Sequence, residues 1–490
     1  MKPSTAFTPI AGSAGNRSPR RAIFISFAII APAIQAVLFL SHANENSQIG
    51  MDFRLTYTVA VAWAQGEDPY DDDALKRVWA RQGTPHVTPP GLPQTPNVYP
   101  LTVAPLLWPL ATLKYTHALA IWTAINATCV AILLIQLLTI PARSPVPVLA
   151  ATCIFLLGFP LQYGFSFGNL AVITTFLVVQ ALRSLQHPLR TGIFLGLALV
   201  KYSLCAPLAL FMAVTGRWRT VAVACAIQVI LIAVATSGPR LNNPTNWLGP
   251  MLATANQSLE PGQPNHHATL AYTALHLELP SLLYRVSPRL DPARHVLVGL
   301  LVIALIAALV RTRRHSKNLP QYCGTGDCVP LLLSSALYDT GHNCGTGVSP
   351  VSHHEPHTRA TRGPEMDSVR TGTPPRKDTW RTATSVEHVA ILAVTLLAFY
   401  HRAYDLIVVV LPLLAILITT HSHLPSRLRA ALWTAAVLTA LPGARYYGGA
   451  PVAHWAGRAI IQPVATWALL AIAVLTIAYL LAPRTQWRVP

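Results

Sequence analysis

Acidic, basic and amide side chains gather in four short polar stretches of a chain that is otherwise strongly apolar. The stretches are MDFRLTY with GEDPYDDD at 51–73, SFGN at 166–169, ANQSLEPGQPN at 255–265 and YHRAYDL at 400–406. Carboxylates and imidazoles can act as general acids or bases, and Asn, Gln and Ser can hydrogen-bond a sugar or a phosphate or simply satisfy a loop. These stretches therefore hold the candidate functional residues.

Two charged residues stand out because of their positions. Asp52 follows the first apolar run closely, so it is either a catalytic carboxylate or a solvated loop residue. Lys201 interrupts a long apolar segment, where a charge is costly unless it faces protein, a water-filled cavity or an anionic partner. The other carboxylates of the first stretch fit solvated turn positions better: Asp68, Asp71, Asp72 and Asp73.

The last polar stretch lies at the head of an apolar helix. His401, Tyr404 and Asp405 are spaced by three and four residues, so a helix would place them on one face. Such a group is either part of a site or a set of interfacial caps and headgroup anchors.

The elements that position these residues are expected to be transmembrane helices. Of 490 residues, 52% are hydrophobic and 11% are charged, and apolar runs recur along the chain, which predicts an all-α polytopic membrane protein. The run at 22–40 would span about 28 Å as a helix, close to the hydrocarbon thickness of a bilayer. A signal peptide is the alternative for this run, but its length and the SHANENSQ that follows favour an uncleaved anchor.

The net charge of +18 does not indicate a nucleic-acid partner, because Lys and Arg fall mainly in short turns between apolar runs. The seven cysteines predict no disulfide framework, since four of them lie inside apolar runs. We therefore expect membrane lipids as partners and a multi-pass protein of the cell inner (plasma) membrane.

Orientation follows from the basic turns. Placing Arg17, Arg20 and Arg21 in the cytoplasm puts the later Arg-rich turns there too, with both termini cytoplasmic. Spans are expected at 22–40, 115–139, 148–166, 169–186, 220–238, 295–310, 387–402, 403–420, 430–443 and 459–482, with a short interfacial or re-entrant helix at 99–113. This gives a bundle of about ten to twelve transmembrane helices with its polar stretches on the outer side.

The segment 191–219 is harder to place, because a single crossing would move its RWR turn to the outer side. A re-entrant hairpin, or two short spans, broken near Lys201 and Pro207 keeps Arg217 and Arg219 cytoplasmic. We therefore expect the chain to fold back there.

The chain divides into four regions. They are a cytoplasmic tail at 1–21, a transmembrane region at 22–311 with outer loops 44–98 and 239–294, a low-complexity cytoplasmic insertion at 312–386, and a second transmembrane region at 387–490. The insertion is rich in Pro, Gly, Ser, Thr, His and Arg and predicts disorder. Its Cys and His residues fit no paired-ligand spacing, so no metal site is expected.

Several short motifs occur in a fixed order along the chain. They are an Asp past the first span, Gly66 to Tyr70 as GxDPY, the proline-rich helix from Tyr99, Gly168-Asn169, a Gly-rich helix with Lys201 before RWR, NQSL at 256–259 and HRAYD at 401–405. Together they resemble glycosyltransferase family 87, integral-membrane enzymes of the GT-C class. The resemblance covers most of the chain except the N-terminal tail and 312–386.

The resemblance implies an enzyme that moves a hexose, typically mannose, from a polyprenyl-phosphate donor to a lipid or glycan acceptor. It implies an extracytoplasmic active-site loop and a single displacement that inverts the anomeric centre. Asp52 would be the catalytic base, and His401 would act near the donor phosphate or the acceptor. The implied substrate-binding residues are Arg54, Tyr70, Asn169, Lys201, Asn256, Gln257, Ser258, Arg402, Tyr404 and Asp405. No cofactor is expected, although EDPYDDD holds enough carboxylates to bind a divalent cation.

A transporter or lipid flippase is the main alternative, with Lys201 and the outer His and Asp residues lining a substrate path. Transporters are typically built from inverted repeats with paired broken helices, and the sequence shows no such internal symmetry. A non-catalytic membrane scaffold is the third interpretation.

Overall fold

The computed structural model describes residues 19–43, 50–82, 97–140, 142, 144–237, 248–258, 293–317, 386–398, 403–419, 424–440 and 464–482. Within these ranges every regular element is a helix, which confirms the expected all-α membrane fold. Five segments are long and apolar enough to cross a bilayer by length and composition: Tyr115–Leu138, Pro145–Phe167, Pro188–Val214, Trp218–Thr236 and Val464–Leu481. Shorter apolar helices lie beside them.

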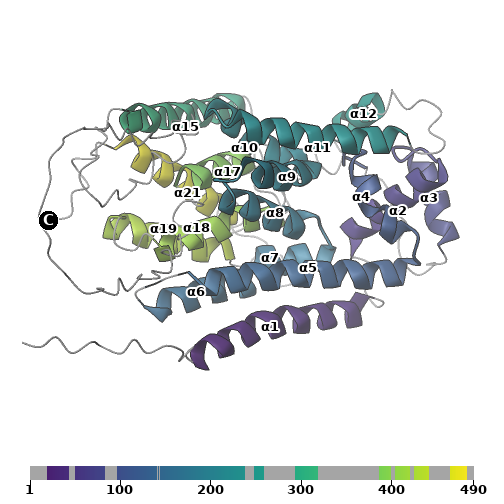
Figure 1. Ribbon diagram of the computed structural model, residues 1–490, viewed down its shortest axis with the longest axis horizontal. Coiled ribbons are helices and arrows are strands. Elements are labelled where there is room, and N and C mark those ends of the chain that lie inside the picture. Colours follow the sequence, from purple (N-terminus) through teal and green to yellow (C-terminus); the bar gives the residue numbers. More distant parts are fainter. Residues whose placement is uncertain are drawn as a thin grey trace, which may run out of the picture.

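The first part of the chain includes two long helices and, at one end of the bundle, a group of three short ones (Figure 1). Its helices are α1 (Pro19–Ala43), α2 (Met51–Gln65), α3 (Asp72–Arg81), α4 (Val103–Ala111), α5 (Tyr115–Leu138), α6 (Pro145–Leu157), α7 (Phe159–Phe167) and α8 (Ala171–Arg183). Helix α1 packs along α5, while α2, α3 and α4 gather near the start of α5.

The remaining helices complete the bundle. They are α9 (Pro188–Ala198), the 3-10 turn η1 (Leu199–Lys201), α10 (Tyr202–Val214), α11 (Trp218–Thr236), α12 (Leu248–Ser258), α15 (Ala293–Lys317), α17 (Val386–Ala398), the 3-10 turn η3 (Ala403–Leu406), α18 (Ile407–Thr419), α19 (Ser426–Ala440) and α21 (Val464–Leu481). Helix α18 packs against α6, α8 and α17, so segments more than 200 residues apart share one core.

Helices α9 and α10 form the expected hairpin, although together they are long enough to cross a membrane. Gly192 faces Val223 and Gly196 faces Ile227, so α9 and α11 run in the same direction. Because α10 joins two parallel helices, it must return along them. Arg217, in the turn after α10, donates from Nη1 to the carbonyl of Leu185, just before α9, at 2.6 Å. We call this end of the bundle the basic end.

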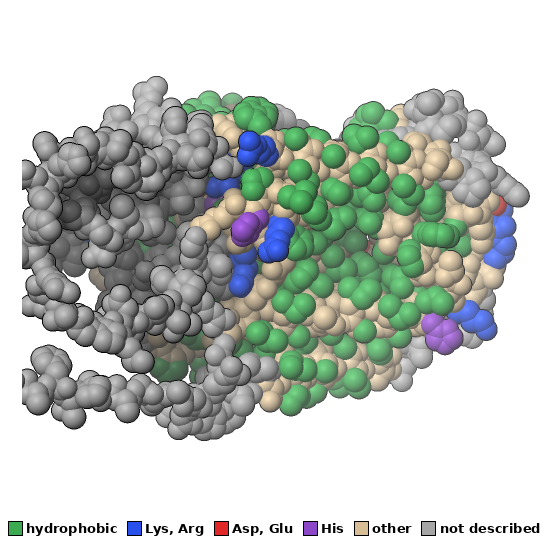
Figure 2. Space-filling model, in the orientation of Figure 1, with side chains coloured by type: hydrophobic (Ala, Val, Ile, Leu, Met, Phe, Trp, Pro, Cys, Tyr) green, Lys and Arg blue, Asp and Glu red, His purple; other side chains and the backbone are tan. Residues whose placement is uncertain are grey.

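The outer surface is suited to lipid. Figure 2 shows hydrophobic side chains covering the middle of the visible face, with Lys and Arg toward its two edges. Large apolar side chains stand exposed on several helices, including Val37, Leu157, Leu210 and Val229. An apolar belt of this extent is typical of a surface that faces hydrocarbon rather than water.

The predicted outer loop 44–98 contains two helices. Helices α2 and α3 fall within it, and α2 is buried from Asp52 to Trp63. Most of the fifteen residues of α2 are apolar or small, so the helix can be buried on several faces. Asp52 lies in its first turn. Asp52 is therefore a buried helix residue, only 7% exposed, and not a solvated loop carboxylate.

Candidate active site

Four polar residues meet in one buried network. One lies at the start of α2, and the others lie in the α7–α8 turn, at the tip of the α9–α10 hairpin and in the η3 turn. Asn169 donates from Nδ2 to Oδ2 of Asp52 at 2.6 Å. Its Oδ1 accepts from Nζ of Lys201 at 3.0 Å. Lys201 in turn forms an ion pair with Oδ1 of Asp405. All four are at most 8% exposed. The structure thus joins four residues that the sequence singled out separately.

The turn between α7 and α8 is built for this contact. Gly168 has φ +64°, a left-handed conformation that glycine adopts without strain, and Trp122 Nε1 donates to its carbonyl at 2.8 Å. Asn169 then accepts the backbone N–H of Ala171 at 2.8 Å, which fixes its side chain at the start of α8. Phe53 stacks on Trp122 with ring centroids 5.1 Å apart, so α2 is held beside the turn.

We expect Gly168→Ala to lower activity without preventing membrane insertion. A Cβ there would lie 2.8 Å from the Cβ of Phe53, in a left-handed conformation that alanine adopts at a cost of about 1 kcal/mol or more. The turn would shift and carry Asn169 away from Asp52. Activity assays on equal amounts of purified protein should show a loss of about tenfold or more, and unchanged activity would contradict this tight packing.

The charges in the network are two carboxylates and one ammonium. A buried charge is tolerated when it is paired and hydrogen-bonded. Asp405 is paired directly with Lys201, and the amide of Asn169 links Asp52 to the same ammonium. This arrangement holds Asp52 by a neutral donor, which suits a carboxylate that must accept a proton during a reaction.

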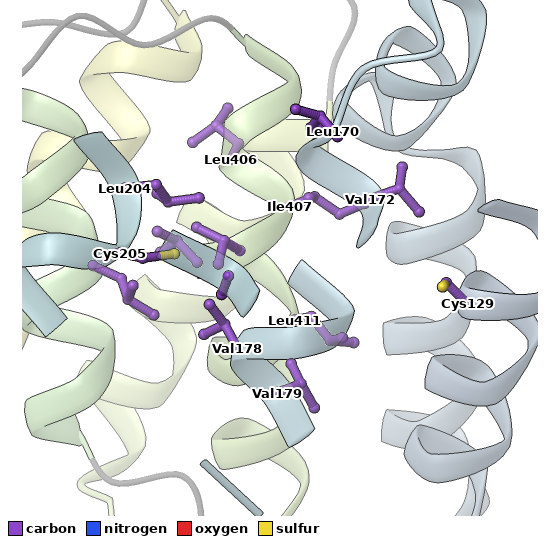
Figure 3. Close-up of a cluster of buried hydrophobic side chains, with 14 of the residues drawn as sticks. Cys129, Leu170, Val172, Val178, Val179, Leu204, Cys205, Leu406, Ile407 and Leu411 are labelled. Carbon is purple, nitrogen blue, oxygen red and sulfur yellow. The ribbon is translucent and has the colours of Figure 1, made fainter. Parts of the chain in front are cut away.

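The network lies part-way through the bundle. Helix α8 has 13 residues between the Asn169 turn and the basic end, and α9 with η1 brings Lys201 to a similar height. Thirteen residues rise about 20 Å, against about 30 Å of hydrocarbon. In a bilayer with one boundary at the basic end, the network would therefore lie about 10 Å below the opposite face. Beside it, buried apolar side chains of α8, α10 and α18 form a layer that includes Val178, Leu204 and Leu411 (Figure 3).

Tyr99 belongs to the network, and the sequence analysis did not select it. Its hydroxyl accepts from Asn169 Nδ2 at 3.1 Å. Tyr70 donates to the carbonyl of Tyr99 at 3.0 Å, and Asn97 donates to the carbonyl of Pro69 at 3.0 Å. Through these two hydrogen bonds, the GEDPY motif holds the segment that contains Tyr99 in place. Its signal was present in the proline-rich motif that begins with this tyrosine, but nothing local distinguished its hydroxyl from a headgroup anchor.

Arg54 lies outside the network. Two positions after Asp52 on α2, it points to another side, with Cζ 5.6 Å from the centroid of the Trp79 ring, and is 2% exposed. Its guanidinium stabilises the contact between α2 and α3 by a cation–π interaction. The resemblance suggested that Arg54 binds the substrate. The structure places its guanidinium over Trp79 instead, and substrate binding by Arg54 stays a prediction.

The acidic cluster is only partly made of turn residues, because Asp72 and Asp73 begin α3. Asp71 caps α3 by accepting the N–H of Asp73 at 3.0 Å, and Asp68 accepts the N–H of Tyr70 at 2.9 Å. Glu67 accepts from Arg81 at 3.1 Å, and this hydrogen bond holds the pKa of Glu67 below its usual value. These carboxylates shape the end of the bundle rather than the network.

The remaining predicted site residues lie wholly or partly outside the described residues. His401 and Arg402 are outside them. Tyr404 contributes backbone to η3, next to Asp405. Asn256, Gln257 and Ser258 end α12, and only their backbone is described.

Comparison with known proteins identifies the region that holds most of this network. Residues 97–334 match the model of glycosyltransferase family 87. This match supports the assignment of the chain to glycosyltransferase family 87. The family 87 region includes Tyr99, Asn169 and Lys201, while Asp52 and Asp405 lie outside the match. No curated protein and no solved structure matches the chain. The protein is therefore a multi-pass membrane glycosyltransferase that acts on a sugar donor and an acceptor.

Proposed function

We propose that this family 87 protein transfers a hexose, mannose in the first instance, from a polyprenyl-phosphate donor to a lipid or glycan acceptor. The observation that carries the proposal is Asp52, a buried carboxylate held by an amide at the meeting point of three chain reversals. A buried, hydrogen-bonded carboxylate recessed into an apolar bundle is suited to a reaction on a lipid-linked substrate.

In the proposed reaction, Asp52 removes the proton from the acceptor hydroxyl as its oxygen attacks the anomeric carbon. The bond between that carbon and the donor phosphate oxygen breaks, and the electron pair leaves with the polyprenyl phosphate. Attack from the side opposite the phosphate inverts the anomeric centre. General-base assistance of this kind contributes about 10² to 10⁴ in rate. A monophosphate leaving group needs no cofactor in this scheme.

His401 and Arg402 are the residues we propose for charge on the leaving phosphate. They immediately precede Ala403, where η3 begins, and Asp405 of that turn joins the network. Cationic donors that are already in place stabilise a departing oxyanion more strongly than mobile water does. We also propose that the basic end is cytoplasmic, since Arg183, Arg190, Arg217 and Arg219 flank its two turns.

The test is transfer by purified protein in lipid vesicles. Radiolabelled polyprenyl-phosphate mannose and a nucleotide-linked mannose are supplied in separate reactions, with a lipid extract as acceptor. We expect label in the acceptor from the polyprenyl donor, and equal transfer by Asp73→Asn, an exposed carboxylate whose side chain is 76% accessible. Transfer from the nucleotide sugar alone, or no hexose transfer from any polyprenyl phosphate, would refute the proposal.

A further inference from the structure

The ammonium of Lys201 reaches the network from the tip of the α9–α10 hairpin. It pairs with Asp405 of η3 and donates to Oδ1 of Asn169 at 3.0 Å. Charge balance explains its contact with Asp405. It does not require the second contact, which joins the ammonium to the residue that binds Asp52.

An asparagine amide can be turned over so that its oxygen and nitrogen exchange places. Here Oδ1 accepts from both Lys201 and the N–H of Ala171, while Nδ2 donates to Asp52 and to the Tyr99 hydroxyl. Turning the amide over would put its NH₂ against an ammonium and its oxygen against a carboxylate. The two donors on Oδ1 therefore fix the NH₂ toward Asp52.

We propose that Lys201 is a positioning residue, which orients Asn169 so that its amide holds Oδ2 of Asp52 in place for proton transfer. The inference rests on the role proposed for Asp52 above. Asp405 has a supporting part, because its carboxylate holds the ammonium within reach of Asn169. In this arrangement the hairpin and the η3 turn both act on the base through one amide.

A charge-balancing role alone predicts a different outcome. Removing one member of a buried ion pair leaves an unpaired charge, so we expect Lys201→Met alone to destabilise the fold. The paired variant Lys201→Met with Asp405→Asn leaves neither charge behind. If Lys201 only neutralises Asp405, the paired variant regains both stability and turnover.

The experiment measures kcat and KM for the lipid donor, together with thermal stability in detergent. The proteins are the wild type, Asn169→Ala, the paired variant and the combination of all three substitutions. Under the proposal, Asn169→Ala and the paired variant each lower kcat about 10- to 100-fold, with KM for the donor within about twofold. The combination is no worse than Asn169→Ala, because both changes disable the same contact.

Gln180→Leu is the matched control. It removes another interhelical amide contact, in which Gln136 donates to Gln180 at 3.2 Å, away from Asp52. We expect it to affect stability more than kcat. Equal losses in the control and the paired variant would mean that any lost polar contact in the bundle has this effect, and would overturn the proposal.

Two other results would overturn it. Recovery of kcat in the paired variant reduces Lys201 to charge balance, and a raised KM with unchanged kcat makes it a donor-binding residue. A failure of the proposed function can be told apart from these two results. In that case the wild type transfers no sugar, or Asp52→Asn transfers sugar at the full rate.

Discussion

Asp52→Asn should lower sugar transfer by about 10² to 10⁴-fold while the protein remains folded. The variant side chain has nearly the same shape, and its carbonyl oxygen can still accept from Asn169, which donates to Oδ2 in the wild type at 2.6 Å. What it loses is the ability to take a proton. Initial rates at equal protein amounts, with thermal melting beside them, measure the two effects separately.

Asp73→Asn is the control for this change, because it makes the same substitution at an exposed residue of α3. If Asp52→Asn transfers sugar at the wild-type rate, the base lies elsewhere, and Asp405 becomes the next candidate. If Asp52→Asn loses both activity and folded protein, a second variant, Asp52→Glu, tests whether Asp52 is the base. Glutamate keeps a carboxylate and should retain more activity than asparagine.

Gly192→Leu is the second substitution from which we expect a large effect. A Cβ at this position would lie 2.5 Å from the Cβ of Val223 and 2.7 Å from the carbonyl oxygen of Thr220. Helices α9 and α11 pack too closely there for any side chain, so they must separate. Overpacking of this kind costs about 1–3 kcal/mol and more where backbone must move. Thermal melting of the purified protein should show this loss of stability directly.

The same substitution should also reduce transfer by the protein that remains folded, because α9 leads directly into Lys201. Gly299→Leu on α15 is the matched control, since a Cβ there meets nothing within 4 Å. Equal melting of the two glycine variants would contradict the close, parallel packing of α9 on α11.

The sequence predicted the long helices because an uninterrupted apolar run of spanning length has few other stable conformations in a membrane. It also predicted the α9–α10 hairpin, since Lys201 in mid-segment and the arginines after it were hard to reconcile with one crossing. Helix α2 was missed. Asp52, Arg54, Thr56 and Thr58 break its apolar pattern, and its burial depends on contacts with α3, α4 and α5 that no local pattern encodes.

The candidate residues were found one by one, but their pairing was not. Asn169 and Asp52 are 117 positions apart, and Lys201 and Asp405 are 204 apart. Contacts over such separations depend on how whole helices pack, so the polar stretches could be assigned only to one side of the membrane. Tyr99 was missed for the same reason, because its hydroxyl gains a role only where the 97–100 segment meets the α7–α8 turn.

The recess of about 10 Å also bears on a competing reaction. A sugar on a phosphate can be passed to water as well as to an acceptor, and hydrolysis wastes the donor. Here Asp52, in the first turn of α2, is buried and shares the amide of Asn169 with the Tyr99 hydroxyl, and an apolar layer lies toward the basic end. Excluding bulk water from such a site favours a bound hydroxyl over solvent. In the proposed reaction, the depth of the network would thus govern fidelity, which is the number of sugars that reach an acceptor for each one lost to hydrolysis.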